Sequence, residues 1–426
     1  MSSVCKMKRF GLSTFLRRVW SSVFNGLFWP KMLRHFSKLR RVRTARQAWV
    51  DRFCPVVPGR VVFASFSGGC SCNPRAVARE LAKRRPDVEI VWLLDPLAFK
   101  ARGGRADTGR AVLKSTWAEY KMIATAAVLV ENAQLFVGAS KPVKRTDQLY
   151  INTWHGSLGI KRLETARRSI RAAASRRSQR IDLLLTNSTF EEEIFRASLF
   201  PETPFARVGH PRNDVFFRPE AERNAIRDSV RRSIGIDATT KVALYAPTFR
   251  EDAFADGTAF DFGAWADALA ARFGGRWVVA VKLHPHDAHA LADGLFTLPK
   301  GILDVSDFED IQDLLVTADV GVTDYSSWIF DFLLCGRPGF IYAPDKEDYD
   351  RSRGFYYPLE EAPFPVSTDQ AGLCESIRAF DADRFAVERR RFLKRRGCME
   401  DGHASARVVD MIVTHLDRLA AKKRIG

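Results

Sequence analysis

The chain has 426 residues, of which 46% are hydrophobic, so it is long enough for two globular domains with extensions. Seven cysteines, an odd number without a CxxC pair, argue against a disulfide scaffold and for a reducing compartment. The formal net charge is +17, but the first fifty residues contain twelve Lys or Arg and no Asp or Glu. The basicity is therefore concentrated at the N-terminus, and no recognised nucleic-acid-binding motif accompanies it.

The N-terminal segment, residues 1–58, is predicted to be a basic amphipathic arm. Its apolar side chains recur at helical spacing, with basic side chains between them. Such a helix can lie in the headgroup region of an anionic leaflet, where each Lys or Arg contributes about 1 kcal/mol. We expect peripheral attachment to an anionic membrane surface, with a helix packed on the first domain as the alternative; nucleic acid is not an expected partner. The positions on one helical face are Leu12, Leu16, Val19, Val23 and Leu27.

No segment is predicted to cross the membrane. The best apolar candidate, residues 122–136, is interrupted by Glu131 and Asn132, and spanning requires about 18–20 apolar residues. The N-terminal apolar segment is a poor secretory signal, because polar residues split it and Arg flanks it on both sides. The expected location is the cytoplasmic face of the cell membrane.

After the arm, short apolar runs of strand character alternate with helical patterns in two series. Such alternation is typical of parallel sheets covered by helices on both faces. The sequence therefore predicts an α/β fold with two doubly wound, Rossmann-type domains, like the GT-B enzymes, in which two such domains face a cleft. The expected strands are residues 60–64, 88–94, 126–130, 148–154, 181–186 and the segment entering Gly209 in the first series, and residues 242–246, 277–282, 301–305, 318–323 and 339–342 in the second.

The domain boundary is expected near residue 235, after a polar helix that follows Pro219. Residues 59–235 then form the N-terminal domain, residues 236–395 the C-terminal domain, and residues 396–426 a C-terminal helix. Polar residues follow several of the predicted strands, at the edge where open α/β sheets bind ligands. This pattern favours an enzyme that acts on a phosphorylated nucleotide donor.

His155 follows the predicted strand in NTWHGSLGIK, and Gly156 permits a tight backbone turn close to a substrate. A neutral imidazole with an ordinary pKa of about 6.5 can accept a proton from an attacking hydroxyl. A lone histidine is more often structural, but the position of His155 at a strand's carboxyl end, with Lys161 shortly after it, favours a catalytic role. Gly156 and Lys161 are candidate acceptor contacts.

In TDYSSWIFDF, Ser326 and Ser327 lie between a predicted strand and a predicted helix. Their hydroxyls and the free N–H groups of the first helical turn can face a phosphate, although an ordinary N-cap would use the same residues. Asp324 and Asp331 are candidate ribose or donor contacts, and Asp331 could instead complement the helix dipole.

Basic residues also follow strands of the second series. In VVAVKLHPH, Lys282 and His284 lie at the sheet's carboxyl edge, and Arg250 closes YAPTFR. Each can neutralise phosphate, although Arg250 could instead form a surface salt bridge. The neighbouring histidines are not expected to hold a metal, because Pro285 disrupts a helical ligand spacing and no cysteine or paired acid accompanies them. In GHPRND, the residues after His210 are better suited to locking the turn between the domains than to reacting.

Taken together, these segments resemble the CDP-glycerol glycerophosphotransferases of the teichoic-acid and capsule type. The resemblance runs in unbroken order over about residues 60–415, and nine motifs in order make it specific. They are SFSGG…NPRA, NTWHGS…K, GHPRND, YAPTFR, KLHPH, TDYSSWIFDF, GRP, YAPDKEDYDRSRGFYY and DGHASARVVD.

The resemblance implies a CDP-glycerol or CDP-ribitol donor held mainly by the C-terminal domain, and a lipid-linked or polysaccharide acceptor held mainly by the N-terminal domain. It implies no metal cofactor. It makes His155 the base and assigns the donor phosphates to Arg250, His284, Ser326 and Ser327. In the expected mechanism, His155 deprotonates the acceptor hydroxyl, which attacks the phosphorus bearing the glycerol, and CMP leaves while Lys282 and His284 help to stabilise the developing charge. His155 and His284 are therefore the expected catalytic residues.

Two alternative functions stay open: a nucleotide-sugar glycosyltransferase on the same fold, and a basic membrane- or RNA-binding scaffold that uses no donor. The sequence departs from the family pattern after WHGS, where LGIKRLE replaces the commoner TPLK and displaces Lys161 relative to the motif. An Arg-rich stretch, residues 167–180, is a candidate contact for an anionic acceptor or for lipid headgroups.

Overall fold

The computed structural model describes residues 45–136, 141–163, 178, 180–248, 261–283, 298 and 301–425. The chain divides into two units, Met1–Pro55 and Val56–Gly426. In the first unit, the described residues form a helix over positions 45–53, and the amphipathic helix predicted around residues 12–27 lies outside the described residues. No helix in the described part of the chain is both long and apolar enough to span a membrane.

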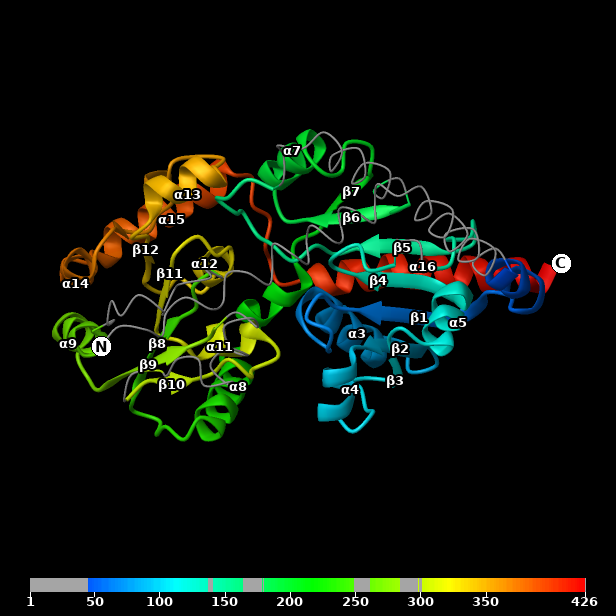
Figure 1. Cartoon of the computed structure of the whole chain (residues 1–426), viewed down its shortest axis with the longest axis horizontal. Coiled ribbons are helices and arrows are strands. Elements are labelled where there is room, and N and C mark those ends of the chain that lie inside the picture. Colours follow the sequence, from blue (N-terminus) through cyan, green and yellow to red (C-terminus); the bar gives the residue numbers. More distant parts are fainter. Residues whose placement is uncertain are drawn as a thin grey trace, which may run out of the picture. The chain divides into compact units, whose positions relative to one another are not determined.

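Seven of the described strands form one sheet, in which each strand runs parallel to its neighbours (Figure 1). The order is β3-β2-β1-β4-β5-β6-β7, so strands are added first on one side of β1 and then on the other. Ligands of such sheets bind outside the strands' carboxyl ends, where this direction reverses. The strands are β1 (Val57–Ala64), β2 (Glu89–Leu94), β3 (Arg110–Leu113), β4 (Ala126–Glu131), β5 (Leu149–Asn152), β6 (Leu183–Thr186) and β7 (Phe205–Arg207).

Side chains of β1 alternate between the two faces of this sheet. Val61 and Phe63 belong to the core on one face, whereas Val62 and Ala64 belong to the core on the other. Both sets are apolar because helices cover both faces. The helices α3 (Cys72–Arg84) and α16 (Ala404–Ile425) contribute to the first core, and α5 (Trp117–Thr125) and α7 (Thr189–Ala197) contribute to the second.

The C-terminal helix returns to the first sheet. In sequence α16 follows every strand of the second sheet, yet it contacts α3, β1 and β4 (Figure 1). The chain therefore passes to the second sheet through η1 (Pro211–Phe217) and α8 (Glu220–Ser233) and comes back before α16. The buried apolar residues of α16 are Ala404, Val408, Val409, Ile412 and Leu416.

A second sheet contains six described strands, again all parallel, in the order β10-β9-β8-β11-β12-β13. Its strands are β8 (Lys241–Tyr245), β9 (Trp277–Val281), β10 (Leu303–Asp304), β11 (Val320–Thr323), β12 (Gly339–Tyr342) and β13 (Val366–Ser367). Its helices include α9 (Phe262–Phe273), α11 (Ile311–Thr317), α12 (Trp328–Leu333), α13 (Lys346–Ser352), α14 (Gln370–Arg378) and α15 (Ala382–Arg395).

The predicted α/β architecture is confirmed, and a strand is found at each predicted position. The edge strand β10 is shorter than the predicted residues 301–305, and the short edge strands β3 and β13 were not predicted. The boundary predicted near residue 235 falls between α8 and β8. The assignment of the two sheets to separate acceptor and donor domains stays a prediction.

Candidate active site

His155 lies in the loop that follows β5, at the carboxyl edge of the first sheet. Before it, Thr153 donates to the backbone carbonyl of Glu131 through its N–H (2.6 Å) and its Oγ1 (3.0 Å). Trp154 adopts a left-handed conformation (φ 54°), and Asn152 Oδ1 accepts a hydrogen bond from its N–H (2.8 Å). Because this conformation is uncommon for a residue other than glycine, the bonds at the strand ends are needed to hold the turn that presents His155.

One hydrogen bond and two aromatic rings hold the imidazole of His155. Its Nδ1 lies 2.6 Å from the carbonyl oxygen of Asn132. A carbonyl oxygen only accepts, so Nδ1 carries a hydrogen, and Nε2 of the neutral ring keeps the lone pair that can take up a proton. The ring stacks on Trp154, with 4.7 Å between centroids, and lies 5.1 Å from the ring of Phe66.

The environment of His155 favours the neutral imidazole. The residue is exposed to solvent, but its ring packs against the rings of Trp154 and Phe66, which removes water from part of it. This desolvation lowers the pKa of His155 below its usual value, and the positive charge of Arg212 acts in the same direction, while the carbonyl of Asn132 opposes both. A base that is neutral at cellular pH is what removal of a proton from an alcohol requires.

A buried carboxyl group supports the chain that carries Asn132. Glu131 Oε1 accepts hydrogen bonds from Tyr150 Oη and Asn152 Nδ2, each at 2.8 Å, and its Oε2 accepts from the N–H of Leu135 at 3.0 Å. Burial raises the pKa of Glu131 to about 7, although the hydrogen bonds that the carboxyl group accepts act to lower the pKa. The sequence analysis missed this role, although an acid inside an apolar strand was a visible signal.

The loop after His155 is tied to α12 by an arginine. Arg212 Nη2 donates to the carbonyl oxygen of Gly156 at 2.7 Å. The same guanidinium donates to both carboxylate oxygens of Asp331, through Nε at 2.8 Å and Nη2 at 3.2 Å. Gly156 has no room for a side chain, because a Cβ there would lie 2.8 Å from Nε1 of Trp154. One guanidinium therefore holds the His155 loop and α12 together.

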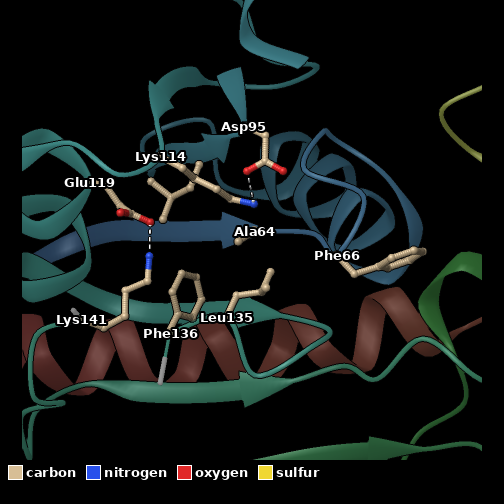
Figure 2. Close-up of a pocket in the computed structure, with 9 residues that line it drawn as sticks. Ala64, Phe66, Asp95, Lys114, Glu119, Leu135, Phe136 and Lys141 are labelled. Atoms are coloured by element: carbon tan, nitrogen blue, oxygen red, sulfur yellow. Dashed lines mark hydrogen bonds and ion pairs between the residues drawn. The ribbon is translucent and has the colours of Figure 1, made fainter. Parts of the chain in front are cut away.

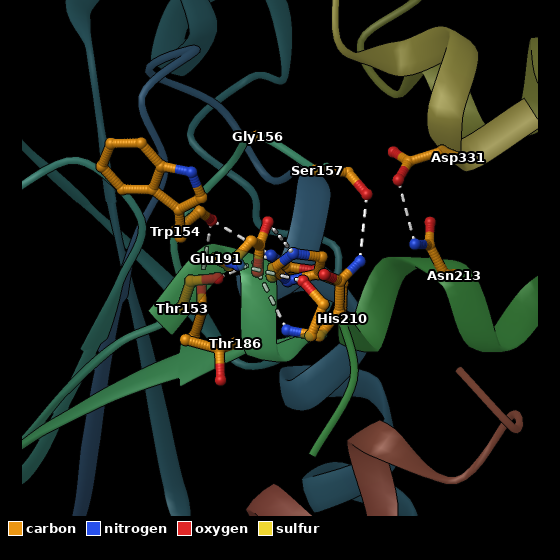
Figure 3. Close-up of polar contacts among 12 residues, drawn as sticks. Thr153, Trp154, Gly156, Ser157, Thr186, Glu191, His210, Asn213 and Asp331 are labelled. Carbon is orange, nitrogen blue, oxygen red and sulfur yellow. Dashed lines mark hydrogen bonds and ion pairs between the residues drawn. The ribbon is translucent and has the colours of Figure 1, made fainter. Parts of the chain in front are cut away.

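Arg212 and Asp331 form a buried ion pair, with side chains only 4% and 3% exposed. Burial is the largest single effect and would raise the pKa of Asp331, but the charge of Arg212 and the hydrogen bonds from Arg212 and Asn213 act together against it, and the pKa is lowered. Asn213 and Gln312 donate to Asp331 at 3.0 and 3.1 Å, and Figure 3 shows Asp331 on α12 directed toward Asn213 on η1. The ribose contact predicted for Asp331 would require some of these bonds to open. Arg212 and Asn213 join the two sheets, the bracing role that the sequence favoured for them.

A second buried network reaches Ser157. Asn187 Nδ2 donates to Ser157 Oγ and to Glu400 Oε1, each at 3.0 Å, and the bond to Ser157 is drawn in Figure 3. Glu400 also accepts from the backbone N–H of His210 at 3.2 Å, and His210 Nε2 lies 3.1 Å from Glu191 Oε1. Burial raises the pKa of Glu400 to about 7, against the opposing effect of His210. Asn187 and Glu400 lie 213 residues apart, and the sequence analysis assigned no role to either.

The same loop approaches the serines that precede α12. A Cβ placed at Gly159 would lie 3.7 Å from Cβ of Ser327. Ser326 and Ser327 are partly exposed, and the Ser327 side chain makes no capping bond to α12 within the described part of the chain. The structure thus brings the His155 loop close to Ser327, one of the two predicted phosphate-binding serines.

Two other predicted donor contacts bond to the protein itself. Asp324 is buried and accepts from the N–H (2.9 Å) and Oγ1 (2.7 Å) of Thr248. Lys282 Nζ donates to the carbonyl oxygens of Ser306 (3.0 Å) and Phe308 (2.6 Å). Burial lowers the pKa of Lys282 to about 8, against the effect of nearby carboxylates. The hydrogen bonds of Asp324 therefore hold Thr248 in place. An ammonium group has three N–H donors, so Lys282 keeps one donor for a phosphate.

Lys161 belongs to a segment that pairs with the loop after α13. It forms an antiparallel bridge with Phe355, and the carbonyl oxygen of Ile160 accepts from the N–H of Tyr356 at 2.7 Å. The charge of Lys161 is close enough to His155 to add to the desolvation that lowers the histidine's pKa. Its contact with the acceptor stays a prediction.

Arg250, His284 and most of the Arg-rich residues 167–180 lie outside the described residues. Within the described ranges, no group of three or more His, Cys, Asp or Glu side chains is placed to hold a metal ion.

Residues 47–414 match the family model described as CDP-glycerol:poly(glycerophosphate) glycerophosphotransferase. The chain is 29% identical over 406 residues to a teichoic acid poly(glycerol phosphate) polymerase from Staphylococcus epidermidis, which covers 90% of this chain and 55% of that protein. It is 30% identical over 381 residues to a teichoic acid ribitol-phosphate primase from Bacillus spizizenii, which covers 85% of this chain and 92% of that protein. The chain thus spans about half the length of the staphylococcal relative and most of the Bacillus one.

Solved structures of the wall teichoic acid polymerase TagF are also similar to the chain. Two variants, one of them soaked with CDPG, match with a TM-score of 0.75 at 26% and 27% identity. Each match covers 93% of this chain and 100% of the TagF chain. This similarity confirms the GT-B-like fold predicted from the sequence.

Proposed function

Because the chain belongs to the CDP-glycerol:poly(glycerophosphate) glycerophosphotransferase family, we propose that it transfers glycerol phosphate, or a similar polyol phosphate, from a CDP-alcohol to a hydroxyl group of a cell-envelope acceptor. CMP is the second product. Relatives named for glycerol phosphate and relatives named for ribitol phosphate are both similar to the chain, so the proposal covers both donors. The acceptor is a lipid-linked or polysaccharide chain.

In the proposed reaction, Nε2 of His155 takes the proton from the acceptor hydroxyl. The alcohol oxygen then forms a bond to the phosphorus that bears the glycerol, and the bond from that phosphorus to the bridging oxygen breaks. CMP leaves with the bridging oxygen and its electron pair. The hydrogen bond from Nδ1 to Asn132 sets the tautomer, and it orients the ring while the imidazolium exists.

On the donor side, Ser326 and Ser327 are assigned to the diphosphate, with Lys282 behind them. Arg250 and His284, which lie outside the described residues, are proposed to contact the same diphosphate on the strength of the family motifs. Residues 59–235 are proposed as the acceptor domain and residues 236–395 as the donor domain. Charged donors aimed at the leaving group lower the barrier where negative charge accumulates.

The observation that carries the proposal is the convergence of the His155 loop with the start of α12. The loop is bonded to Arg212 through Gly156, and a Cβ added at Gly159 would lie 3.7 Å from Cβ of Ser327. This supports the proposal because transfer between two bound substrates requires the proposed base and the proposed phosphate-binding segment, which follow strands of different sheets, to lie close together.

A donor panel tests the proposal. The protein is incubated with membrane acceptor and with CDP-glycerol, CDP-ribitol or UDP-sugars, and released CMP or UDP is measured. We expect CMP from a CDP-alcohol, reduced about 100-fold or more in His155→Gln and unchanged in the matched variant His415→Gln on α16. Release of UDP from a UDP-sugar, with no CMP from either CDP-alcohol, would establish the glycosyltransferase alternative instead.

The N-terminal arm, residues 1–58, is proposed to attach the enzyme peripherally to the cytoplasmic leaflet. Its support is the charge of the first fifty residues, with twelve basic and no acidic side chains. Co-sedimentation should be strong with anionic vesicles, weak with zwitterionic vesicles, and reduced by salt. Equal binding to both kinds of vesicle would contradict an electrostatic attachment.

A further inference from the structure

A pocket of about 290 Å³ lies at the carboxyl ends of the first sheet's strands (Figure 2). Its lining includes Ala64 at the end of β1, Leu93 near the end of β2, and Leu135 just beyond β4. The strand order reverses between β1 and β4, so the pocket occupies the position where open parallel sheets bind ligands. Its volume lies at the lower end of the range for small-molecule sites, enough for one unit of a polymer.

Phe66 connects this pocket to the proposed base. Its side chain lines the pocket and is 53% exposed, and its ring centroid lies 5.1 Å from that of His155. The backbone N–H of Phe66 donates to Asn132 Oδ1 at 2.8 Å, and the carbonyl of the same Asn132 accepts from His155. A group bound against Phe66 would therefore lie next to the imidazole, on the acceptor side of the reaction.

The charges that line the pocket cancel in pairs. Lys114 Nζ lies 3.1 Å from Asp95 Oδ1, and Lys141 forms an ion pair with Glu119, as the dashed lines in Figure 2 show. A phosphate entering here would meet two carboxylates at close range and would have to displace them from the lysines. A hydroxyl group can instead donate to a carboxylate and accept from an ammonium, so both pairs suit a neutral ligand with several hydroxyls.

The apolar part of the lining fits the same ligand. Phe66, Leu135 and Phe136 offer aromatic and aliphatic surface to C–H groups, while the ion pairs offer hydrogen bonds. Sites lined mainly by apolar side chains, with a few convergent polar groups, are typical of small-molecule recognition. Sugars and polyols fit such a lining, because each of their carbon atoms can offer C–H groups to apolar side chains and a hydroxyl group to a polar one.

We propose that this pocket binds a neutral, hydroxyl-rich unit of the acceptor, a sugar or a polyol, and holds it beside His155. The inference rests on the transferase function proposed above, and it names the class of acceptor that the site takes. Asp95, Lys114, Glu119 and Lys141 are the groups that bind its hydroxyls. Phosphate groups of the acceptor lie outside the pocket.

The test uses the full-length protein, CDP-glycerol, and three probes that share an octyl chain: octyl β-glucoside, 1-O-octylglycerol and octyl phosphate. CMP release gives KM for the donor and for the two alcohol probes; octyl phosphate, which has no alcohol hydroxyl to accept the transfer, is added as a competitor and gives an inhibition constant. In Lys114→Met and Asp95→Asn, we expect KM for the sugar or polyol probe to rise about tenfold, as loss of a charged hydrogen bond predicts. KM for CDP-glycerol should not change. The probe with the lower wild-type KM tells whether a sugar or a polyol is the unit bound.

Lys144→Met is the matched control, because Lys144 also pairs with an acid beside the first sheet, Asp182 just before β6, at 2.9 Å, but does not line the pocket. It should leave all KM values unchanged, and circular dichroism should show that every variant is folded. Unchanged acceptor KM in both pocket variants, or tighter binding of octyl phosphate than of the other probes, would overturn the proposal.

Failure of the proposed function can be recognised separately. If the wild type releases no CMP from CDP-glycerol, the proposed transferase function is wrong. Saturation-transfer NMR with octyl β-glucoside and 1-O-octylglycerol then tests, independently of activity, whether the pocket binds a sugar or a polyol. A transfer signal that is present in the wild type and lost in Lys114→Met supports the pocket. Equal signals in both proteins, or none in either, reject it.

Discussion

Replacement of Arg212 by leucine should separate the stability of the protein from its activity. In the folded chain the Arg212 guanidinium donates two bonds to Asp331 and one to the carbonyl of Gly156. Arg212→Leu leaves a buried carboxylate without its cation, and removal of one partner of a buried ion pair costs about 3–5 kcal/mol. The free energy of unfolding should fall by that amount, and kcat/KM should fall because Gly156 and the His155 loop lose their anchor.

The double variant Arg212→Leu/Asp331→Leu distinguishes the two effects. Replacing a buried ion pair by apolar side chains is often neutral or stabilising, so most of the lost stability should return. Activity should not return, since the guanidinium that donates to the carbonyl of Gly156 is still missing.

The pH dependence of the protein's stability has a definite sign. The pKa of Asp331 is lowered in the folded protein, so the wild-type pair stabilises the fold above the unfolded-state pKa of about 3.9 and is lost as the pH falls through the folded-state value. In Arg212→Leu the unpaired carboxyl should have a raised pKa. The stability deficit of that variant should therefore shrink between about pH 7 and pH 5, as the buried group takes up a proton.

Chemical denaturation followed by circular dichroism, together with CMP release, measures both quantities. The matched control is Arg351→Leu, because Arg351 pairs with Asp348 on the surface, with side chains 74% and 76% exposed. That variant should show no measurable change. If Arg212→Leu were as stable and active as the control, or if the double variant regained full activity, the argument that this pair braces the active site would be refuted.

Three further predictions follow from the site. The lowered pKa of His155 means that kcat/KM should stay on its plateau to a pH below about 6.5 and fall only as the imidazole becomes protonated; an acid limb centred above pH 6.5 would contradict this. Gly156→Ala should reduce CMP release about tenfold or more, because its Cβ would lie 2.8 Å from Trp154 Nε1, whereas Gly159→Ala, with its nearest contact at 3.5 Å, should be tolerated. Chelation with EDTA should leave the rate of CMP release unchanged, as the family resemblance implies, and a loss of activity restored by a divalent cation would show that the implied metal-free mechanism is wrong.

Much of the fold was predictable because its signals are local. Apolar runs such as the one in β1 identify strands whichever residues they later pair with, and helices such as α9 and α11 carry their own start signals in Asp261 and Asp310. The edge strands β3 and β13 were missed because neither shows the apolar run of a buried strand: only Val112 of the four residues of β3 is buried, and β13 has only two residues. Their pairing with longer neighbours defines them as strands.

The position of His155 was predictable for a related reason, since the end of a parallel strand marks the edge where ligands bind. What surrounds it was not predictable. Arg212 and Asp331 lie 119 residues apart, and Asn187 and Glu400 lie 213 residues apart. No local pattern records such contacts.

The sequence by itself therefore determined the two α/β sheets, the family, and the loops that end at the strands' carboxyl edges. Only the tertiary structure decided what the side chains in those loops bond to: Asp324 accepts hydrogen bonds from Thr248, and Lys282 donates to two backbone carbonyls. It also decided that α16 packs against the first sheet rather than the second. The physical reason is that strand and helix patterns arise from neighbours along the chain, whereas burial and hydrogen bonding of a polar side chain depend on residues that folding brings beside it.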